Sequence, residues 1–98
     1  MSEWVEWEKR GAVAVVTLKN PPVNALGVGL RQAIIAAVGR AVGDDAVSAV
    51  VLAGAGRCFS GGADIREFGQ PAVDPTLPQV IEEIESSPKP VIAAVHGP

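Results

Sequence analysis

The fold of this chain is decided by Gly56-Arg57-Cys58-Phe59-Ser60-Gly61-Gly62-Ala63-Asp64-Ile65. This stretch follows an apolar run, residues 47–53, that predicts a buried strand, and its glycines precede a helix-start signal at Asp64. Because glycine has no Cβ, main-chain N–H groups beside it can approach a ligand oxygen closely. The stretch therefore favours an anion or oxyanion site built from main chain, with an ordinary turn as the alternative.

The rest of the chain alternates strand and helix patterns. Residues 5–8 alternate apolar with acidic side chains, as a half-exposed strand does, and Lys9-Arg10-Gly11 predicts a turn. Further strands are predicted over residues 12–18, 47–53 and 91–95. This order of strands and helices implies parallel pairing with right-handed crossovers, so the predicted fold class is α/β.

Two segments have helical periodicity. Apolar residues recur at spacings of three and four over residues 30–42, which leaves Arg31, Gln32 and Arg40 off the apolar stripe. Gly43 ends this predicted helix. A second amphipathic helix is predicted over residues 77–84, and the proline-rich residues 70–78 before it are predicted to form a surface loop.

Composition limits the function. Ninety-eight residues allow one small domain, and 48% hydrophobic residues suffice for a packed core. A net charge of −3 without a basic stripe argues against nucleic acid as the main partner. Cys58 is the single cysteine, so no intrachain disulfide forms. No apolar run has the length of a membrane span, and residues 1–6 lack the features of a signal peptide, so a cytoplasmic location is predicted.

The predicted sheet lacks part of its cover. Only two helices are available for three parallel strands, whereas a parallel sheet is normally covered on both faces. We therefore expect the chain to be a truncated part of a longer protein, or to associate with a partner through the unfinished sheet. Homo-oligomers are the expected form of that association.

A glycine-rich loop after a strand also raises the possibility of nucleotide binding. Gly54 and Gly56 form a G-x-G pair, but Phe59 stands where a dinucleotide fingerprint needs its third glycine. The chain has no Gly-Lys-Ser/Thr sequence, so the pattern of a phosphate-binding P-loop is absent. A dinucleotide site is thus disfavoured.

Three blocks in order carry a family resemblance: residues 20–26 (NPPVNAL), residues 59–65 (FSGGADI) and residues 89–97 (KPVIAAVHG). With them the chain resembles the crotonase (enoyl-CoA hydratase/isomerase) superfamily over essentially all of its length. Residues 63–68 and the following proline-rich loop are similar to the hydratase portion of bifunctional β-oxidation proteins. The resemblance implies that residues 1–98 are the N-terminal portion of a single acyl-CoA-binding domain, part of a crotonase-like ββα-superhelix.

The resemblance also implies roles for single residues. The backbone N–H of Ala63 would be one of two donors that hold a thioester carbonyl, and a helix starting near Asp64 would point its positive end at that oxygen. The predicted contacts with coenzyme A and its thioester are Gly61, Gly62, Ala63, Asp64, Ile65, Arg66, Asn24, Ala25 and Leu26. Coenzyme A enters as part of the substrate, and no separate cofactor or metal is expected.

The same resemblance implies that the catalytic apparatus is incomplete. The second N–H donor and the catalytic glutamates would follow residue 97, and Gly97-Pro98 departs from the family's usual continuation. We therefore expect the 98-residue chain to be inactive as an enoyl-CoA hydratase. The alternative function is a non-catalytic CoA-binding or interaction module.

Several of these side chains also have a purely structural interpretation. Asp64 is a natural helix N-cap, and Arg66 is as consistent with a surface charge as with a phosphate contact. Glu67 is expected to be a solvated residue in a first helical turn.

Overall fold

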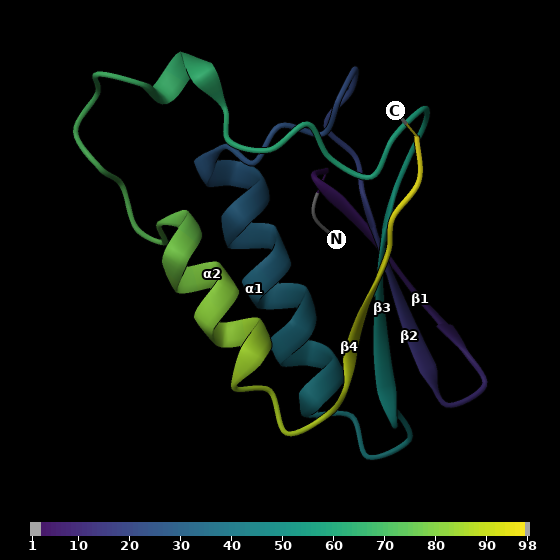
Figure 1. Ribbon diagram of the computed structural model, residues 1–98. Helices are drawn as coiled ribbons and strands as arrows, with labels where there is room; N and C mark the ends of the chain where they lie inside the picture. Colours follow the sequence, from purple (N-terminus) through teal and green to yellow (C-terminus); the bar gives the residue numbers. More distant parts are fainter. Residues whose placement is uncertain (1–2, 98) are drawn as a thin grey trace.

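A computed structural model describes residues 3–97 of the chain (Figure 1). The described residues do not include Met1, Ser2 and Pro98. The predictions about a signal peptide in residues 1–6 and about the family's continuation at Gly97-Pro98 therefore lie partly outside them. The elements in chain order are β1 (Val5–Arg10), β2 (Val13–Leu18), α1 (Val28–Val42), β3 (Ala49–Gly54), the 3-10 turn η1 (Ile65–Glu67), α2 (Leu77–Glu85) and β4 (Val91–Ala94).

The strands form one sheet in the order β1-β2-β3-β4. β1 pairs with β2 antiparallel, while β2–β3 and β3–β4 are parallel and are joined by crossovers that contain α1 and α2. The α/β class predicted from the element order is therefore confirmed. β1 continues to Arg10, so the turn of the first hairpin begins at Gly11, two residues later than predicted, and Gly11 takes a φ of +60°.

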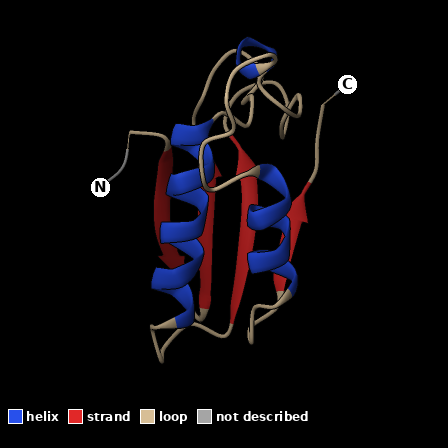
Figure 2. Cartoon of the chain, turned by 90° about the vertical axis from the view of Figure 1, so that its left-hand side faces the viewer, coloured by secondary structure: helices blue, strands red, loops and turns tan. Residues whose placement is uncertain are grey.

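Both helices pack on the same face of the sheet, as Figure 2 shows. The core between these layers contains alternate residues of the strands, among them Val16, Val50 and Leu52, together with the apolar stripe of α1. A cavity of about 310 Å³ with almost entirely apolar walls remains between α2 and the sheet. The packing therefore forms a core on one side only.

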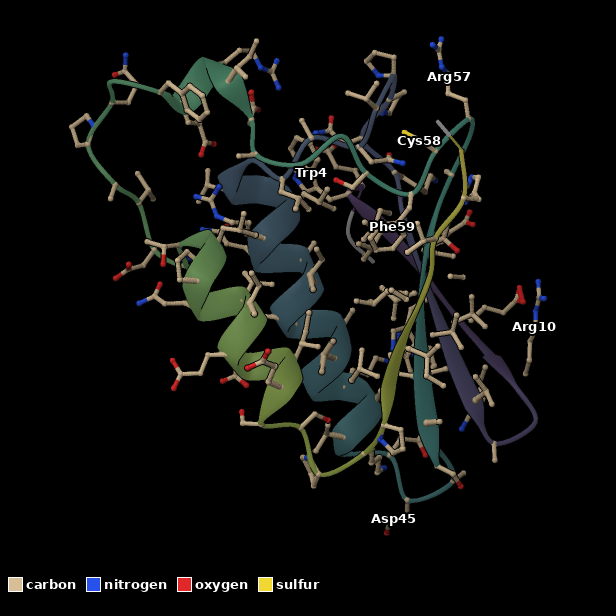
Figure 3. All side chains as sticks on the ribbon, in the orientation of Figure 1. Trp4, Arg10, Asp45, Arg57, Cys58 and Phe59 are labelled. Carbon is tan, nitrogen blue, oxygen red and sulfur yellow. The ribbon has the colours of Figure 1, made fainter. Side chains whose placement is uncertain are left out.

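The opposite face of the sheet has no cover among the described residues. Its side chains are the alternate set, which the strand register aligns as Glu8, Val15, Val51 and Ile92 across the four strands. Ile92 is 56% exposed, and Arg10 extends on this side, away from the helices (Figure 3). The predicted shortage of helical cover is thus confirmed.

The helices confirm the predicted periodicity, with one correction. α1 begins at Val28, two residues before the predicted start, and ends at Val42 with Gly43 as its C-cap. Arg31 was predicted to lie off the buried stripe, and this was wrong, since Arg31 is only 7% exposed. α2 starts with a capping box between Thr76 and Gln79, so Pro78 belongs to its first turn and not to the preceding loop.

Within the described part of the chain, no helix has the length and apolar character needed to cross a membrane.

Candidate functional site

Asn24 holds the loop that follows β3. Its side-chain amide donates to the carbonyls of Ala55 (3.0 Å), Cys58 (3.1 Å) and Phe59 (3.1 Å). Phe59 and Cys58 are labelled beside the end of the sheet in Figure 3. Asn24 has a φ of +52°, a left-handed conformation that asparagine tolerates better than most residues. One side chain thus satisfies three carbonyls of the glycine-rich stretch.

The remaining polar groups of Asn24 are also bonded within the chain. Its Oδ1 accepts the N–H of Asn20 at 2.8 Å, and its carbonyl accepts the Ser60 hydroxyl at 2.8 Å. Asn24 is 1% exposed. This geometry gives Asn24 a structural role, and a side-chain contact with coenzyme A would require these bonds to break.

The loop then pairs with residues 23–26. The N–H of Gly61 donates to the carbonyl of Val23 at 2.6 Å, and the N–H of Leu26 donates to the carbonyl of Gly62 at 2.8 Å. Leu26 and Ala63 form an isolated parallel bridge. The predicted contact residues Ala25 and Leu26 are therefore brought beside Gly61, Gly62 and Ala63, although 35 or more residues separate the two segments in sequence.

These bonds orient the Ala63 N–H. The Gly62 carbonyl and the Ala63 N–H belong to one planar trans peptide, so they point in opposite directions. Since the carbonyl faces Leu26, the N–H faces away from it. Within residues 3–97 this N–H has no hydrogen-bond acceptor, and Ala63 is exposed. The donor is therefore available to a ligand oxygen.

Asp64 and Arg66 form a closed local pair. The Arg66 backbone N–H and Nε donate to Asp64 Oδ1 at 3.0 and 2.9 Å, and Nη2 donates to Oδ2 at 2.7 Å. The guanidinium of Arg66 beside Asp64 lowers the pKa of that carboxyl group, and the backbone bond acts in the same direction. The predicted N-cap role of Asp64 is confirmed.

The predicted helix at Asp64 was wrong. Residues 65–67 form a single 3-10 turn, and the chain then continues extended at Phe68. So short a turn has little aligned dipole, because the macrodipole sums over successive peptide units. Charge stabilisation at Ala63 by a helix terminus is therefore not supported, and the backbone N–H is the donor that remains.

Glu67 was expected to be solvated, but its carboxylate is bonded on both sides. Oε1 accepts from Arg31 Nη1 at 2.9 Å, and Oε2 accepts the N–H of Val28 at 2.9 Å. The bond from Arg31 lowers the pKa of Glu67, as does the bond from Val28. Sequence spacing did not indicate this pair. Gly27 at the α1 N-terminus supplies no side-chain cap, however, so the first N–H groups of α1 need an acceptor from elsewhere.

Two hollows meet at Ala63. One, of about 400 Å³, is lined by residues that include Ala25, Gly61 and Ile65. The other, of about 330 Å³, has Leu26, Phe68 and Leu77 among its lining residues. Ala63 and Asp64 line both hollows, and Leu26 and Leu77 also line the apolar cavity under α2. The free N–H thus belongs to a residue shared by two hollows, one of which has two lining residues in common with the apolar cavity.

The described residues contain no group of three His, Cys, Asp or Glu side chains that could hold a metal ion. His96 is exposed with its Nε2 3.1 Å from the Gly56 carbonyl, and Cys58 is buried with its Sγ 3.7 Å from the Val23 carbonyl. Neither side chain lies beside an evident catalytic partner.

The family model for enoyl-CoA hydratase/isomerase matches residues 8–98. The chain therefore belongs to the enoyl-CoA hydratase/isomerase family. The glycine loop anchored by Asn24 and the free N–H of Ala63 are features of a member of this family. The resemblance drawn from the three sequence blocks is confirmed.

Individual relatives agree with this assignment. The chain is 49% identical over 86 residues to a peroxisomal bifunctional enzyme of Danio rerio, covering 88% of this chain and 12% of the relative. It is 41% identical over 92 residues to a probable enoyl-CoA hydratase of Bacillus subtilis, covering 87% and 36%. A solved enoyl-CoA hydratase/isomerase from Xanthobacter autotrophicus superposes with a TM-score of 0.87 at 34% identity, covering 100% of this chain and 40% of that one.

The chain therefore spans well under half the length of these relatives. The predicted crotonase-like fold and the resemblance to bifunctional β-oxidation enzymes are both confirmed by these matches.

Proposed function

We propose that this chain binds an acyl-CoA thioester and supplies one half of an oxyanion hole through the N–H of Ala63. The observation that carries the proposal is the free, exposed N–H of Ala63 on a peptide whose carbonyl is fixed by Leu26. Family membership supports enoyl-CoA as the substrate class and β-oxidation as the chemistry.

The electrostatics of the loop suit this role. Asp64 is paired with Arg66, and Glu67 is paired with Arg31, so both carboxylates near Ala63 are neutralised by a guanidinium. A pre-oriented N–H favours the charge that develops on a thioester oxygen as the enolate forms. Removing such a donor from an enzyme typically costs ~10²–10³-fold in rate.

The two hollows accommodate the two ends of the substrate. The hollow that Gly61, Ile65 and Arg66 help to line would hold the pantetheine and nucleotide portion of coenzyme A. The other hollow shares Leu26 and Leu77 with the apolar cavity under α2, and these apolar walls suit an acyl chain. Because Asn24 is bonded internally, we keep Ala25 and Leu26 as ligand contacts and assign Asn24 to holding the loop.

Hydration of an enoyl-CoA also needs a general acid or base within hydrogen-bond reach of the proton that this group transfers. Asp64 and Glu67 line the same hollow as Ala63, and both of their carboxylates are paired with arginines. We therefore propose that the 98-residue chain binds enoyl-CoA without hydrating it. Coenzyme A enters as part of the substrate, and no separate cofactor is proposed.

A second function is favoured by the sheet itself. In the described residues β4 is an edge strand, so its outer backbone groups have no neighbouring strand there. Ile92, on the uncovered face, and Val95 are 56% and 75% exposed. Such an edge readily pairs with another strand, so association with a second copy of the chain is the alternative role.

The cellular compartment stays a prediction. The relatives from Danio rerio and Cucumis sativus are named as peroxisomal and glyoxysomal, which differs from the cytoplasmic location predicted above.

Calorimetric titration of the chain with crotonyl-CoA and with free coenzyme A tests the proposal. We expect tighter binding of the thioester, since only the thioester has the carbonyl that Ala63 would hold. A parallel absorbance assay should detect no hydration of crotonyl-CoA. Equal affinity for both ligands would contradict the oxyanion role.

A further inference from the structure

Arg31 carries a charge inside the molecule that the proposed thioester chemistry does not use. Its side chain is 8% exposed, and a buried charge is tolerated only when it is paired and hydrogen-bonded. Nε donates to the carbonyl of Pro75 at 2.6 Å, and Nη2 donates to the carbonyl of Val73 at 3.3 Å. Arg31 thereby fastens the proline-rich segment to α1.

The same guanidinium reaches Glu67. Nη1 donates to Glu67 Oε1 at 2.9 Å, and the other carboxylate oxygen accepts the N–H of Val28 in the first turn of α1. A Cβ on Gly27 would lie 3.2 Å from Glu67 Oε2, so the carboxylate sits directly against the helix start. Glu67 therefore connects the segment after Ala63 to the N-terminus of α1.

A fourth bond connects Arg31 to the peptide of the Ala63 N–H. Nη1 also donates to the carbonyl of Leu26 at 2.7 Å, and the Leu26 N–H donates to the carbonyl of Gly62 at 2.8 Å. Gly62 shares its peptide plane with the Ala63 N–H. Arg31 is thus two hydrogen bonds away from the donor peptide through Leu26. Glu67, its partner in the charged pair, is joined to the same peptide by the chain itself, from residue 63 to residue 67.

We infer that Arg31 and Glu67 are positioning residues that hold the Ala63 N–H in the orientation needed for a thioester oxygen. The inference rests on the proposed function for what that N–H does, but the hydrogen bonding that it describes can be measured without ligand. Arg31 is the buried member of the pair, at 8% exposure against 38% for Glu67, so removing the carboxylate leaves its charge uncompensated.

Hydrogen exchange of single amides in the 98-residue chain separates local positioning from general stability. The Leu26 amide reports the bond to Gly62, and the Val50 amide, bonded to the Pro90 carbonyl at 2.8 Å, reports the sheet. In Arg31→Met, the exchange rate of Leu26 relative to Val50 should rise about tenfold or more, because charge-assisted bonds are lost. In Arg31→Lys, the exchange rate of Leu26 relative to Val50 should lie between the values for Arg31→Met and for the unchanged chain.

Two further variants keep the test decisive. Glu67→Gln, at a more exposed position, keeps the side-chain shape but removes the charge, and should raise the same ratio without unfolding the chain. Arg40→Met is the matched control, since Arg40 lies on the same helix but stacks on Trp7 at 3.9 Å. Its ratio should equal that of the unchanged chain. An unchanged ratio in both Arg31→Met and Glu67→Gln would overturn the inference.

Infrared spectra of crotonyl-CoA labelled with ¹³C at the thioester carbonyl distinguish the two proposals. On the unchanged chain, the carbonyl band should move to lower frequency on binding, and Arg31→Met and Glu67→Gln should lose part of that shift. A bound ligand with no shift on the unchanged chain would contradict the oxyanion role alone. A full shift in both variants would overturn the positioning role alone.

Discussion

The N–H of Leu26 donates to the carbonyl of Gly62 at 2.8 Å and thereby orients the neighbouring N–H of Ala63. The two segments come together because Asn24, two residues before Leu26, anchors the glycine-rich stretch through its side chain. The orientation of the Ala63 N–H, the proposed oxyanion donor, is thus fixed by a short run of residues before α1.

Gly62→Ala should destabilise the chain through its backbone. Gly62 has a φ of +97°, and a Cβ there would meet nothing within 4 Å, so strain and not collision is the expected cause. The free energy of unfolding in urea should fall by about 1–2 kcal/mol.

Gly39→Ala is the matched control for that change. Gly39 lies in α1, and its Cβ would also meet nothing within 4 Å, but its backbone is helical. Alanine should raise the free energy of unfolding by about 0.5–1 kcal/mol. The same sign for both substitutions would contradict the role assigned to the backbone of Gly62.

Asn24→Ala should lower the free energy of unfolding by about 1–3 kcal/mol, because the carbonyls of Cys58 and Phe59 lose a buried donor. Asn24→Asp should lower the free energy of unfolding further at neutral pH, since a carboxylate oxygen would then face those carbonyls. Urea unfolding of both variants checks the order. If aspartate were tolerated better than alanine, the anchoring role of Asn24 would be wrong.

Acid should weaken the contact between Glu67 and Arg31. The pKa of Glu67 in the folded chain lies below its ordinary value of 4.5, chiefly because of the bond from Arg31. A carboxyl group with a lowered pKa contributes stability that is fully present above its unfolded pKa and is lost as pH falls through the folded pKa. Stability should therefore decline below pH 4.5.

Glu67→Gln supplies the comparison for this titration. Its stability at neutral pH should be lower than that of the unchanged chain, and its decline in acid should be shallower. Urea midpoints measured across the acid range check both statements. Parallel curves for the two chains would show that Glu67 does not contribute to the acid dependence.

Association should depend on the uncovered sheet face. Ile92 is 56% exposed on β4, and we expect the chain to sediment as oligomers at high concentration. Ile92→Lys should shift the population toward monomer, whereas Val73→Lys, at a 54% exposed loop position, should not. A monodisperse monomer of the unchanged chain would contradict this prediction.

Periodicity predicted most of the fold, because each helix and strand buries one face against its neighbours. It failed at Arg31, which stands seven residues before the buried Val38 and so lies on the buried side of α1. A charged side chain is normally expected at the surface. Arg31 can be buried because it pairs with Glu67, which is 36 residues away in the sequence. Local spacing contains no information about a pair so distant in sequence.

The site was predicted in the same uneven way. The glycines and the N-cap at Asp64 are local features, so the sequence revealed them. The loop was expected to start a helix, but the backbone is extended at Phe68 and Gly69 takes a φ of +80°, so the turn ends after residues 65–67. The structural role of Asn24 depends on carbonyls more than 30 residues away, which no local pattern indicates.

The central claim is tested most directly by following the Ala63 amide in a ¹H–¹⁵N NMR titration with crotonyl-CoA. An N–H that donates to a thioester oxygen should move downfield as the ligand binds, and free coenzyme A should not produce that movement. Saturating binding of crotonyl-CoA with the Ala63 amide unmoved would contradict the account.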